Sequence, residues 1–418
     1  MFSTWGALTG LAVAIVLIVR KATPAYALVF GALLGGLLGG GGLPETVSAM
    51  ISGTQSMMPS VLRILTSGIL AGALVKTGSA ERMADSIIRA LGARFAIAAI
   101  AMATMVVTAV GVFVDIAVIT VAPVALAVGR RASIPVPALL MAMVGGGKAG
   151  NVISPNPNTI AAADAFGVDL TALMVKNVIP ALCALAVTVA VATLLAKKRL
   201  IGGEPPSGEV QGDGGSRPAL WAALSGPILV VGLLALRPVC GFAVDPLVAL
   251  PAGGMMSILM CGEWRRTAAH CEYGLSKVTG VAILLVGTGA VAGIVKNSGL
   301  NADMISLLNA CHMPAFALAP LSSVLLSGAT ASTTAGVTIA AQTFSGTLVE
   351  AGVPALSAAA MLHAGGTIFD ALPHGSFFHA TAGAVGMGVK DRLKLFPFGT
   401  LAGATSAVMS VVVYLLGL

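Results

Sequence analysis

GGGKAGNVISPNPNT, residues 145–159, interrupts an apolar segment that runs from about residue 135 to residue 168. Proline has no backbone N–H and disfavours a helical conformation in the residue before it, so two prolines within three residues end a helix. Inside hydrocarbon, backbone that leaves the helix is tolerated only where protein buries it or where it lines a water-filled cavity. In a membrane, this stretch therefore predicts a broken helix beside a polar chamber.

The composition of the whole chain indicates that its surroundings are a membrane. Hydrophobic residues make up 57% of the 418 residues and charged residues only 9%, against roughly 25% charged in an ordinary soluble domain. Mean hydropathy is +0.98. So few charges exclude a cytosolic enzyme, a nucleic-acid-binding protein and a disordered chain. The apolar runs are continuous rather than alternating, which disfavours a transmembrane barrel, and we predict a polytopic all-α protein in the lipid bilayer.

The basic residues orient the chain, because cytoplasmic loops of membrane proteins are enriched in Lys and Arg. Apolar runs occur at about 3–19, 24–42 and 60–75, and Arg20-Lys21 follows the first run. The N-terminus is thus expected outside, and the same threading leaves the C-terminus outside as well. This assignment of spans places most of the basic residues that give the net charge of +7 in cytoplasmic loops, and Arg392 is one of them. The basic residues that it places elsewhere are Arg63, Lys176, Arg237 and Lys296, outside, and Lys148, within the membrane.

The apolar stretch 95–129 has cytoplasmic charge at both ends and follows a short amphipathic helix predicted at 79–92. It is long enough for two full spans with a tight outer turn, and equally for a re-entrant hairpin that turns back at mid-membrane. Asp115 at its centre favours the hairpin. A lone carboxylate in lipid costs roughly 2.5–3.5 kcal/mol, so it belongs beside a protected cavity.

The chain divides near its middle into two halves. Residues 200–217 are polar and rich in Gly and Pro, which predicts a cytoplasmic linker between a first transmembrane repeat, 1–199, and a second, 218–418. The second half contains its own apolar pair at 314–345 and its own broken span at about 353–380. Each half thus has three spans, a surface helix, a hairpin, a broken span and a final span.

A short sequence match supports this internal repeat. LVKTG at 74–78 resembles IVKNSG at 294–299, about 220 residues later. The predicted linker starts the second half on the opposite side of the membrane from the first. The predicted fold class is therefore two inverted-topology repeats, each with a re-entrant hairpin and a broken transmembrane helix, which is typical of secondary transporters.

The first interruption is dense in short hydrogen-bonding side chains, which suit a polyhydroxylated or carboxylated solute. A half-helix that starts near Asn158 would direct free N–H groups at an anion. Lys148 either attracts a substrate carboxylate, or extends to an interface, or pairs with Asp115 or Asp164. The candidate substrate-binding residues here are Lys148, Asn151, Ser154, Asn156, Asn158 and Thr159.

The second half offers the same chemistry at the centre of its apolar pair, residues 327–334. Small residues there permit close backbone approach and the hydroxyls can donate to a solute, although small residues also serve helix packing in membranes. In the second broken span, His374 is a further candidate. From this half the candidate substrate-binding residues are Thr330, Ser332, Thr333 and His374.

Protonatable groups in the hairpins and broken spans make proton coupling plausible, since buried carboxylates can carry protons. The candidate proton-coupling residues are Asp115, Asp164 and Asp370, and three histidines lie nearby in sequence, His363, His374 and His379. No nucleotide-binding, zinc, dinucleotide or nucleophile motif is present, so we expect no cofactor, no metal site and no enzyme activity. Sodium coupling through backbone carbonyls leaves little trace in a sequence and stays open.

Four stretches resemble a known family. GVFVD at 111–115 matches a hairpin tip that contains a glycine, an aromatic residue and an acidic residue. Residues 154–163 with 167–169 are similar to the family's PPHPGPVAAA…GAD signature. SGATA at 327–331 is similar to a GSATA-like hairpin tip, and DALPH at 370–374 is similar to the SLPH variant of the family's last broken span. Over nearly its whole length the chain thus resembles the GntP-type gluconate:proton symporter family, within the ion-transporter superfamily of inverted-repeat carriers.

This chain departs from the family pattern at several positions. Asp115 replaces the usual Glu, Asn156 replaces the signature's His, and Asn158-Thr159 replace Gly-Pro. His374-Gly375 stand where gluconate-type members often have Asn-Asp. The family also carries other sugar acids, short hydroxy acids, dicarboxylates and D-serine. The resemblance implies proton symport across the plasma membrane, the inner membrane of a bacterium.

We therefore expect a proton-coupled importer of a small organic acid. The expected partners are the small carboxylate, the proton and the lipid bilayer, without nucleic acid. The oligomeric state is open, a homodimer included. The alternatives are a passive anion channel, a sodium-coupled carboxylate carrier, and a membrane-embedded enzyme or scaffold, for which no catalytic cluster is found.

Overall fold

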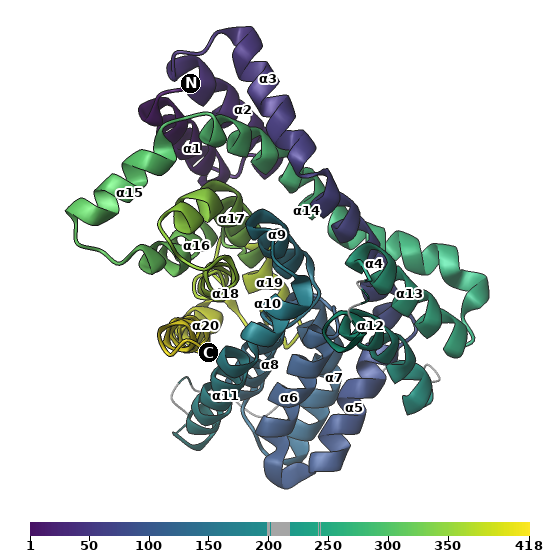
Figure 1. Ribbon diagram of the computed structural model, residues 1–418. Helices are drawn as coiled ribbons and strands as arrows, with labels where there is room; N and C mark the ends of the chain where they lie inside the picture. The colour runs from purple at the N-terminus through teal and green to yellow at the C-terminus, as the bar shows by residue number, and fades with distance from the viewer. Residues whose placement is uncertain (199–200, 202–217, 241, 243) are drawn as a thin grey trace. The chain divides into compact units, whose positions relative to one another are not determined.

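The computed structural model describes residues 1–198, 201, 218–240, 242 and 244–418. In this part of the chain the fold is all helical, as predicted, and its helices are labelled in Figure 1. The predicted linker, 200–217, lies outside the described residues except for Ile201. The prediction of its position and of the two repeat boundaries stays a prediction.

The helices of the first half follow the predicted order, with one helix more than expected. Residues 43–56 form a helix in the structure, although the sequence analysis assigned them to no span. The helices are α1 (Thr4–Val19), α2 (Pro24–Leu38), α3 (Leu43–Ser56), α4 (Met58–Lys76), α5 (Ser79–Leu91), η1 (Ala93–Phe95), α6 (Ala96–Ala109), α7 (Val114–Arg131), α8 (Val136–Asn151), α9 (Pro157–Phe166), α10 (Leu170–Lys176) and α11 (Val178–Lys198).

The described helices of the second half occur in the same order. The longest of them, α14, has 30 residues and lies before the hairpin of this half. The helices are α12 (Leu220–Cys240), α13 (Pro246–Met260), η2 (Trp264–Arg266), α14 (Thr267–Lys296), α15 (Leu300–Ala310), η3 (Ala315–Ala317), α16 (Leu318–Thr330), α17 (Thr333–Glu350), α18 (Ala355–Gly365), α19 (Ser376–Gly383) and α20 (Val389–Leu415).

Residues with left-handed backbone recur at nearly constant spacing in the two halves. Such residues end helices and turn the chain sharply. Gly111 and Ala331, 220 positions apart, each follow the first helix of a hairpin, and the pairs Ser133 with Gly352 and Gly167 with Gly386 are each 219 apart. The helix order and the turn positions therefore repeat together along the chain.

By its contacts the chain forms two compact units. The first consists of Met1–Ile64, Pro157–Lys176 and Thr279–Asp370, and the second of Leu65–Asn156, Asn177–Val278 and Ala371–Leu418. The unit boundary falls within both predicted interruptions, between Asn156 and Pro157 and between Asp370 and Ala371. Each unit therefore contains one half of each broken span.

In the first unit, α16 and α17 form a hairpin on which α18 packs, and α9 packs against both α17 and α18. These helices are close together in Figure 1. Helices α1 and α2 approach through glycines: a Cβ added to Gly31 would lie only 2.4 Å from the carbonyl oxygen of Gly10. Close approach through small residues is a common packing mode in membranes.

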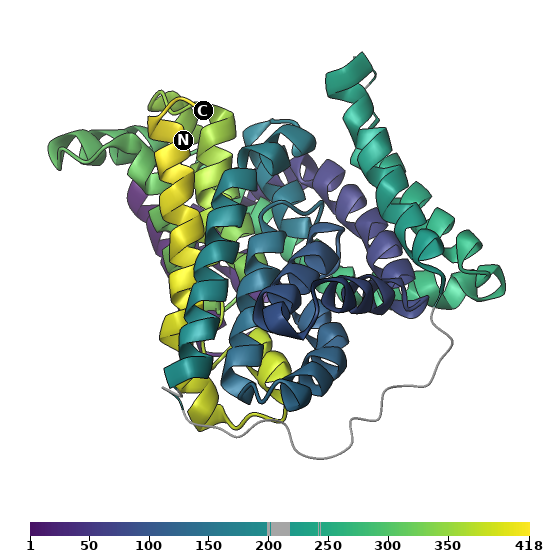
Figure 2. The same ribbon diagram turned by 90° about the horizontal axis from the view of Figure 1, so that it is seen from below.

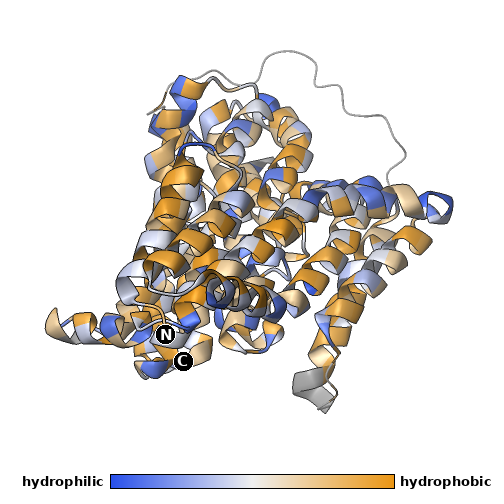
Figure 3. Cartoon of the chain, turned by 90° about the horizontal axis from the view of Figure 1, so that it is seen from above, coloured by the Kyte–Doolittle hydropathy of each residue, from blue (hydrophilic) through white to orange (hydrophobic). Residues whose placement is uncertain are grey.

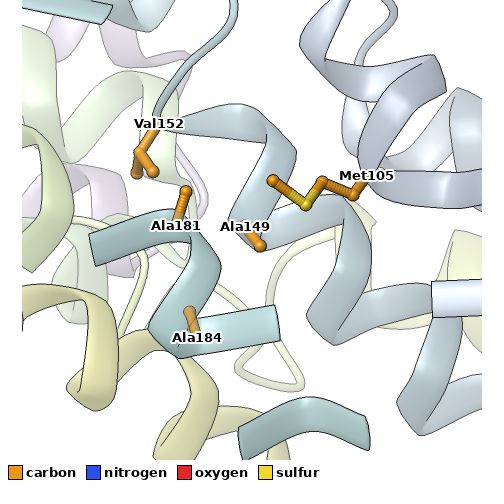
Figure 4. Close-up of a cluster of buried hydrophobic side chains, with 5 residues drawn as sticks. All are labelled: Met105, Ala149, Val152, Ala181 and Ala184. Carbon is orange, nitrogen blue, oxygen red and sulfur yellow. The ribbon is translucent and has the colours of Figure 1, made fainter. Parts of the chain in front are cut away.

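In the second unit, α6 and α7 form the other hairpin, and α8 packs against α6, α7, α11 and α20. Figure 2 shows α11 and α20 side by side. Met105, Ala149, Val152, Ala181 and Ala184 form a buried apolar cluster that joins α6, the end of α8 and α11 (Figure 4). The cluster fixes the backbone just before the first interruption.

Among the described residues, four helices are long and apolar enough to cross a membrane, and α9 with α10, bent by 109°, would form a fifth span. Hydrophobic residues dominate the long helices (Figure 3). Helix α6 has only 14 residues, about 21 Å at 1.5 Å per residue, which is shorter than the roughly 30 Å hydrocarbon core. Of the two interpretations of 95–129, this length favours the hairpin.

Candidate functional site

The first interruption begins later than the sequence pattern suggests. Gly145, Gly146 and Gly147 lie inside α8, which remains helical to Asn151. Added Cβ atoms at these glycines would meet Thr188, Ala101 and Val114 at 2.1–2.5 Å. The glycines therefore serve close packing of α8 against its neighbours, and the break depends on the prolines that follow.

Buried polar side chains close the end of α8. Asn156 Nδ2 donates to the Asn151 carbonyl oxygen at 2.9 Å and to Asn151 Oδ1 at 2.6 Å. Asn151, Ser154 and Asn156 are each at most 3% exposed. The last carbonyls of a helix lack intrahelical donors, and the Asn156 amide supplies one here. The second unit thus places three of the predicted residues together.

Lys148 lies on the same helix and is 2% exposed. Its Nζ donates to the Gly399 carbonyl oxygen of α20 at 3.3 Å. This burial contradicts the interpretation that Lys148 extends to an interface. A cation in the interior of the second unit keeps the role of attracting a carboxylate open.

Asp115 lies in the first turn of α7, directly after the hairpin turn, and is half-buried. Its Oδ1 accepts a hydrogen bond from the Ile116 N–H at 2.9 Å. Carboxylates are stabilised at helix N-termini, where N–H groups point outward.

In the second interruption, His374 precedes α19, and His379 Nε2 lies 2.7 Å from the Pro373 carbonyl oxygen.

The tip of the second hairpin is a polar turn in the first unit. Ala331 has left-handed backbone, with φ 48°, and Ser332 caps α17 by accepting from the Ala335 N–H at 3.3 Å. Thr330 donates to the Leu326 carbonyl oxygen at 2.8 Å. Thr333 Oγ1 donates to Asp370 Oδ2 at 2.7 Å, which links the tip to the second interruption.

Helix α9 supplies the remaining predicted residues of the first unit. Asn158 is 6% exposed and Thr159 is fully buried, both in its first turn. Asp164, further along α9, forms an ion pair with Arg63 and accepts from Ser60 Oγ at 2.5 Å. The Arg63 guanidinium therefore balances the charge of Asp164 within the first unit.

The sequence analysis assigned Arg392 to a cytoplasmic loop; the structure makes it part of a helix instead, and its side of the membrane stays a prediction. Arg392 is 1% exposed, in α20. Its Nη2 donates to Thr381 Oγ1 at 3.4 Å and its guanidinium lies 5.3 Å from the centre of the Phe378 ring. Its exposed neighbours Lys390 and Lys394 make the segment look like an ordinary basic loop, so only the packing of α19 on α20 distinguishes it.

His363, on α18, is fully buried, and neither ring nitrogen has a hydrogen-bond partner in the part of the chain that the structure describes. The same described residues contain no group of three or more His, Cys, Asp or Glu side chains that could hold a metal ion.

Comparisons with known proteins agree with a transport protein. A transporter of Haemophilus influenzae, described as uncharacterized, is 49% identical over 99% of this chain and 98% of its own length. An uncharacterized permease of the same organism is 25% identical over 70% of this chain and 67% of its own length. The crystal structure of the Alcanivorax borkumensis YdaH transporter, described as having an unusual topology, matches with a TM-score of 0.69 at 17% identity, over 89% of this chain and 88% of that one.

The fold is similar to that of this solved transporter, with polar residues buried at two helix interruptions, and the 49% identical relative is described as a transporter. The sequence model of the GntP family permease matches residues 4–417. The chain therefore belongs to the GntP permease family, as its motifs predicted.

Proposed function

We propose that this permease is a secondary active transporter that takes up a small organic acid together with protons, by alternating access. The cargo class is a gluconate-like sugar acid, a hydroxy acid or another small carboxylate. The location is the plasma membrane, the inner membrane of a bacterium, and the protein needs no cofactor and catalyses no chemical step.

One observation carries the proposal: both predicted interruptions are breaks in helices, and buried polar side chains gather at them. Helix α8 ends at Asn151 and α9 begins at Pro157, while α18 ends at Gly365 and α19 begins at Ser376. Half-helices that end inside a membrane direct uncompensated N–H and C=O groups at a solute or ion. A chain without nucleotide-binding motifs draws the energy for uptake from an ion gradient.

The residue types at these breaks favour a carboxylate with hydroxyl groups. The amides Asn151, Asn156 and Asn158 can both donate and accept, and the hydroxyls of Ser154 and Thr159 can do the same. In the second unit, Lys148 carries a positive charge. In the first unit, Thr330, Ser332 and Thr333 carry hydroxyls, and the first turn of α9 has outward N–H groups.

Proton coupling needs a group that changes charge during the cycle. The candidates are the carboxylates of the hairpins and broken spans, Asp115, Asp164 and Asp370. A proton taken up with a carboxylate cancels the charge of the cargo, which lowers the cost of moving it through the membrane.

Uptake into proteoliposomes with an imposed pH gradient tests the proposal. Candidate cargoes are first screened by thermal shift with gluconate, lactate, hydroxybutyrate, tartrate, citrate and serine. The unmodified protein is expected to accumulate at least one of these acids when the outside is acidic, and Asp115→Asn is expected to reduce the accumulation.

Three results would contradict the proposal in different ways. Uptake indifferent to the pH gradient, with Asp115→Asn fully active, defeats proton coupling. Uptake that follows a sodium gradient instead makes the protein a sodium-coupled carrier. Ohmic currents without saturable counterflow make it an anion channel.

A further inference from the structure

A histidine is buried in the half-helix that precedes the second interruption. His363 lies in the last turn of α18, which ends at Gly365, and its exposed fraction is 0%. Neither ring nitrogen has a hydrogen-bond partner among the described residues. Buried polar groups in native proteins are nearly always hydrogen-bonded, so a ring without a partner calls for an explanation.

The repeat in the chain provides an internal comparison for this position. The glycine pairs Gly146-Gly147 and Gly365-Gly366 are 219 residues apart, and the same spacing relates His363 to Val144. Val144 is buried in α8, the half-helix that precedes the first interruption. An apolar side chain thus fills this position in α8, whereas a polar ring, which costs more to bury without a partner, fills it in α18. The difference indicates that the ring serves a purpose other than packing.

The face of α18 that carries His363 packs on the second hairpin. His363 lies three residues before Gly366, and residues at this spacing share a helix face. A Cβ added to Gly366 would lie 2.3 Å from Val337 Cγ2 of α17 and 3.2 Å from Ser327 Oγ of α16. The Ser327 hydroxyl is fully buried and has no hydrogen-bond partner in the described part of the chain either. Two polar side chains without partners therefore lie on neighbouring helices of the first unit.

No charged side chain of the surrounding helices bonds to His363. In the first unit α18 packs on α9, α10, α16 and α17. Of the carboxylates on these helices, Asp164 pairs with Arg63 and Glu350 is exposed. Because a cation buried without a neighbouring anion is unfavourable, the ring is uncharged in this arrangement. The other titratable residues of these helices and of the turns that adjoin them are Asp164, Asp169, Lys176, Glu350 and Asp370.

We propose that His363 is a proton-binding residue of the transport cycle, which takes up one proton together with the cargo carboxylate. This assignment rests on the proposed function. A proton by itself would leave a buried cation at His363, and the cargo by itself would leave a buried anion, and both are costly. Together they form a charge-assisted hydrogen bond between a ring N–H and a carboxylate oxygen, and the pair is neutral.

This pairing fixes the charge balance. One proton from the side of entry binds a ring nitrogen of His363, one cargo carboxylate accepts a hydrogen bond from that ring, and both leave on the other side. Uptake of a monocarboxylate through this step moves no net charge, so it responds to the pH gradient and not to membrane voltage. With one proton per cargo, a gradient of about one pH unit supports about tenfold accumulation.

The variant His363→Gln tests the assignment. Glutamine keeps a donor and an acceptor at this position and cannot hold the proton. The probes are labelled gluconate, lactate and hydroxybutyrate in proteoliposomes, with protein-free vesicles as the blank. We expect the variant to retain counterflow, in which labelled probe exchanges with unlabelled probe inside, and to lose the accumulation driven by an acid exterior. His312→Gln, which replaces an exposed histidine, is the matched control and should accumulate probe normally.

A second measurement follows the proton directly. Nuclear magnetic resonance of the purified protein with isotope-labelled histidine reports the protonation of each ring, and the signals of His363 are those that His363→Gln removes. In acidic buffer we expect the His363 ring to be neutral without probe and protonated once a probe binds. Thermal unfolding establishes that the variants are folded. His363→Val, which copies Val144, replaces the glutamine variant in both measurements if glutamine prevents folding.

Each outcome decides one point. If the folded variant still accumulates probe under the pH gradient, or loses counterflow and accumulation equally, His363 does not carry the coupling proton. A His363 ring that stays neutral when a probe binds contradicts the assignment as well. If the unmodified protein ignores the gradient, the proposed proton coupling fails first, and the ring signal alone then decides whether His363 binds a proton together with the cargo.

Discussion

At the scale of single residues, buried polar side chains in this permease have two kinds of environment. Asn151 and Asn156 bond to each other and close a helix end. Lys148 and Arg392 are cations almost without exposure, and each bonds to a neutral oxygen, the Gly399 carbonyl or the Thr381 hydroxyl. Burying a charge is costly, so these two are the first residues to alter.

Lys148→Gln tests the attraction of cargo by a buried cation. A hydrogen bond to a charged group contributes about 1.5–3 kcal/mol, so we expect the KM for a transported carboxylate to rise roughly 10- to 150-fold with little change in maximal rate. Uptake kinetics in proteoliposomes measure this, with the exposed Lys390→Gln as the control. An unchanged KM with a lowered Tm would instead assign Lys148 to the contact between α8 and α20.

Gly336→Ala tests the close contact within the second hairpin. The added Cβ would lie 2.1 Å from Ser327 Oγ and 2.4 Å from the Ser327 backbone nitrogen, so α17 must shift away from α16. Overpacking of this kind costs about 1–3 kcal/mol, which should lower the Tm in detergent. Gly280→Ala, where an added Cβ meets nothing within 4 Å, should leave the Tm unchanged or raise it. Equal Tm values for the two variants would contradict the described contact.

At the scale of helices, the first broken span has a different cause from the one that its glycines suggest. Helix α8 runs through Gly145–Gly147 because those glycines face neighbouring helices closely. The break follows where Pro155 and Pro157 remove backbone donors. The glycines thus allow α8 to pack closely, and the prolines that follow them end the helix.

Replacing both prolines by alanine should close the first interruption. Each Pro→Ala change favours a continuous helix by about 3 kcal/mol, so Pro155→Ala with Pro157→Ala should raise helix content by circular dichroism and abolish uptake while the protein stays folded. Pro24→Ala, at the start of α2 where proline is tolerated, is the control. Full uptake by the double variant would show that transport does not depend on the break.

At the scale of the whole chain, the two sequence halves exchange half-helices. In the first unit α9, from the first half, packs on α17 and α18 of the second half. In the second unit α19, from the second half, packs on α7 and α8 of the first. Neither half of the sequence therefore contains all the partners of its own broken span.

Cutting the chain within 200–217 tests this exchange. Residues 1–199 and 218–418 expressed separately should fail to give a folded membrane protein, because α9 and α19 would lack the helices on which they pack. Co-expression of the two pieces should restore uptake in cells and co-purification on a tag. A stable, monodisperse 218–418 piece by itself would contradict the reciprocal packing.

The membrane class, most of the order of helices and the existence of the two breaks were predictable without coordinates, although α3 was missed and α8 runs past the glycines where its end was expected. They depend on local properties: apolar length against the bilayer, prolines without an N–H, and glycines or polar residues at sharp turns. The motifs at 111–115 and 154–163 were likewise enough to predict the family to which the chain belongs.

The partners of the site residues were not predictable in this way. That Thr333 donates to Asp370, that Arg392 is buried against α19, and that α9 packs on α17 depend on contacts between residues far apart along the chain. Such contacts follow from how whole helices pack, and many sequence positions of similar polarity compete for each of them. Local pattern therefore identifies which residues are unusual, and tertiary packing determines what each of them touches.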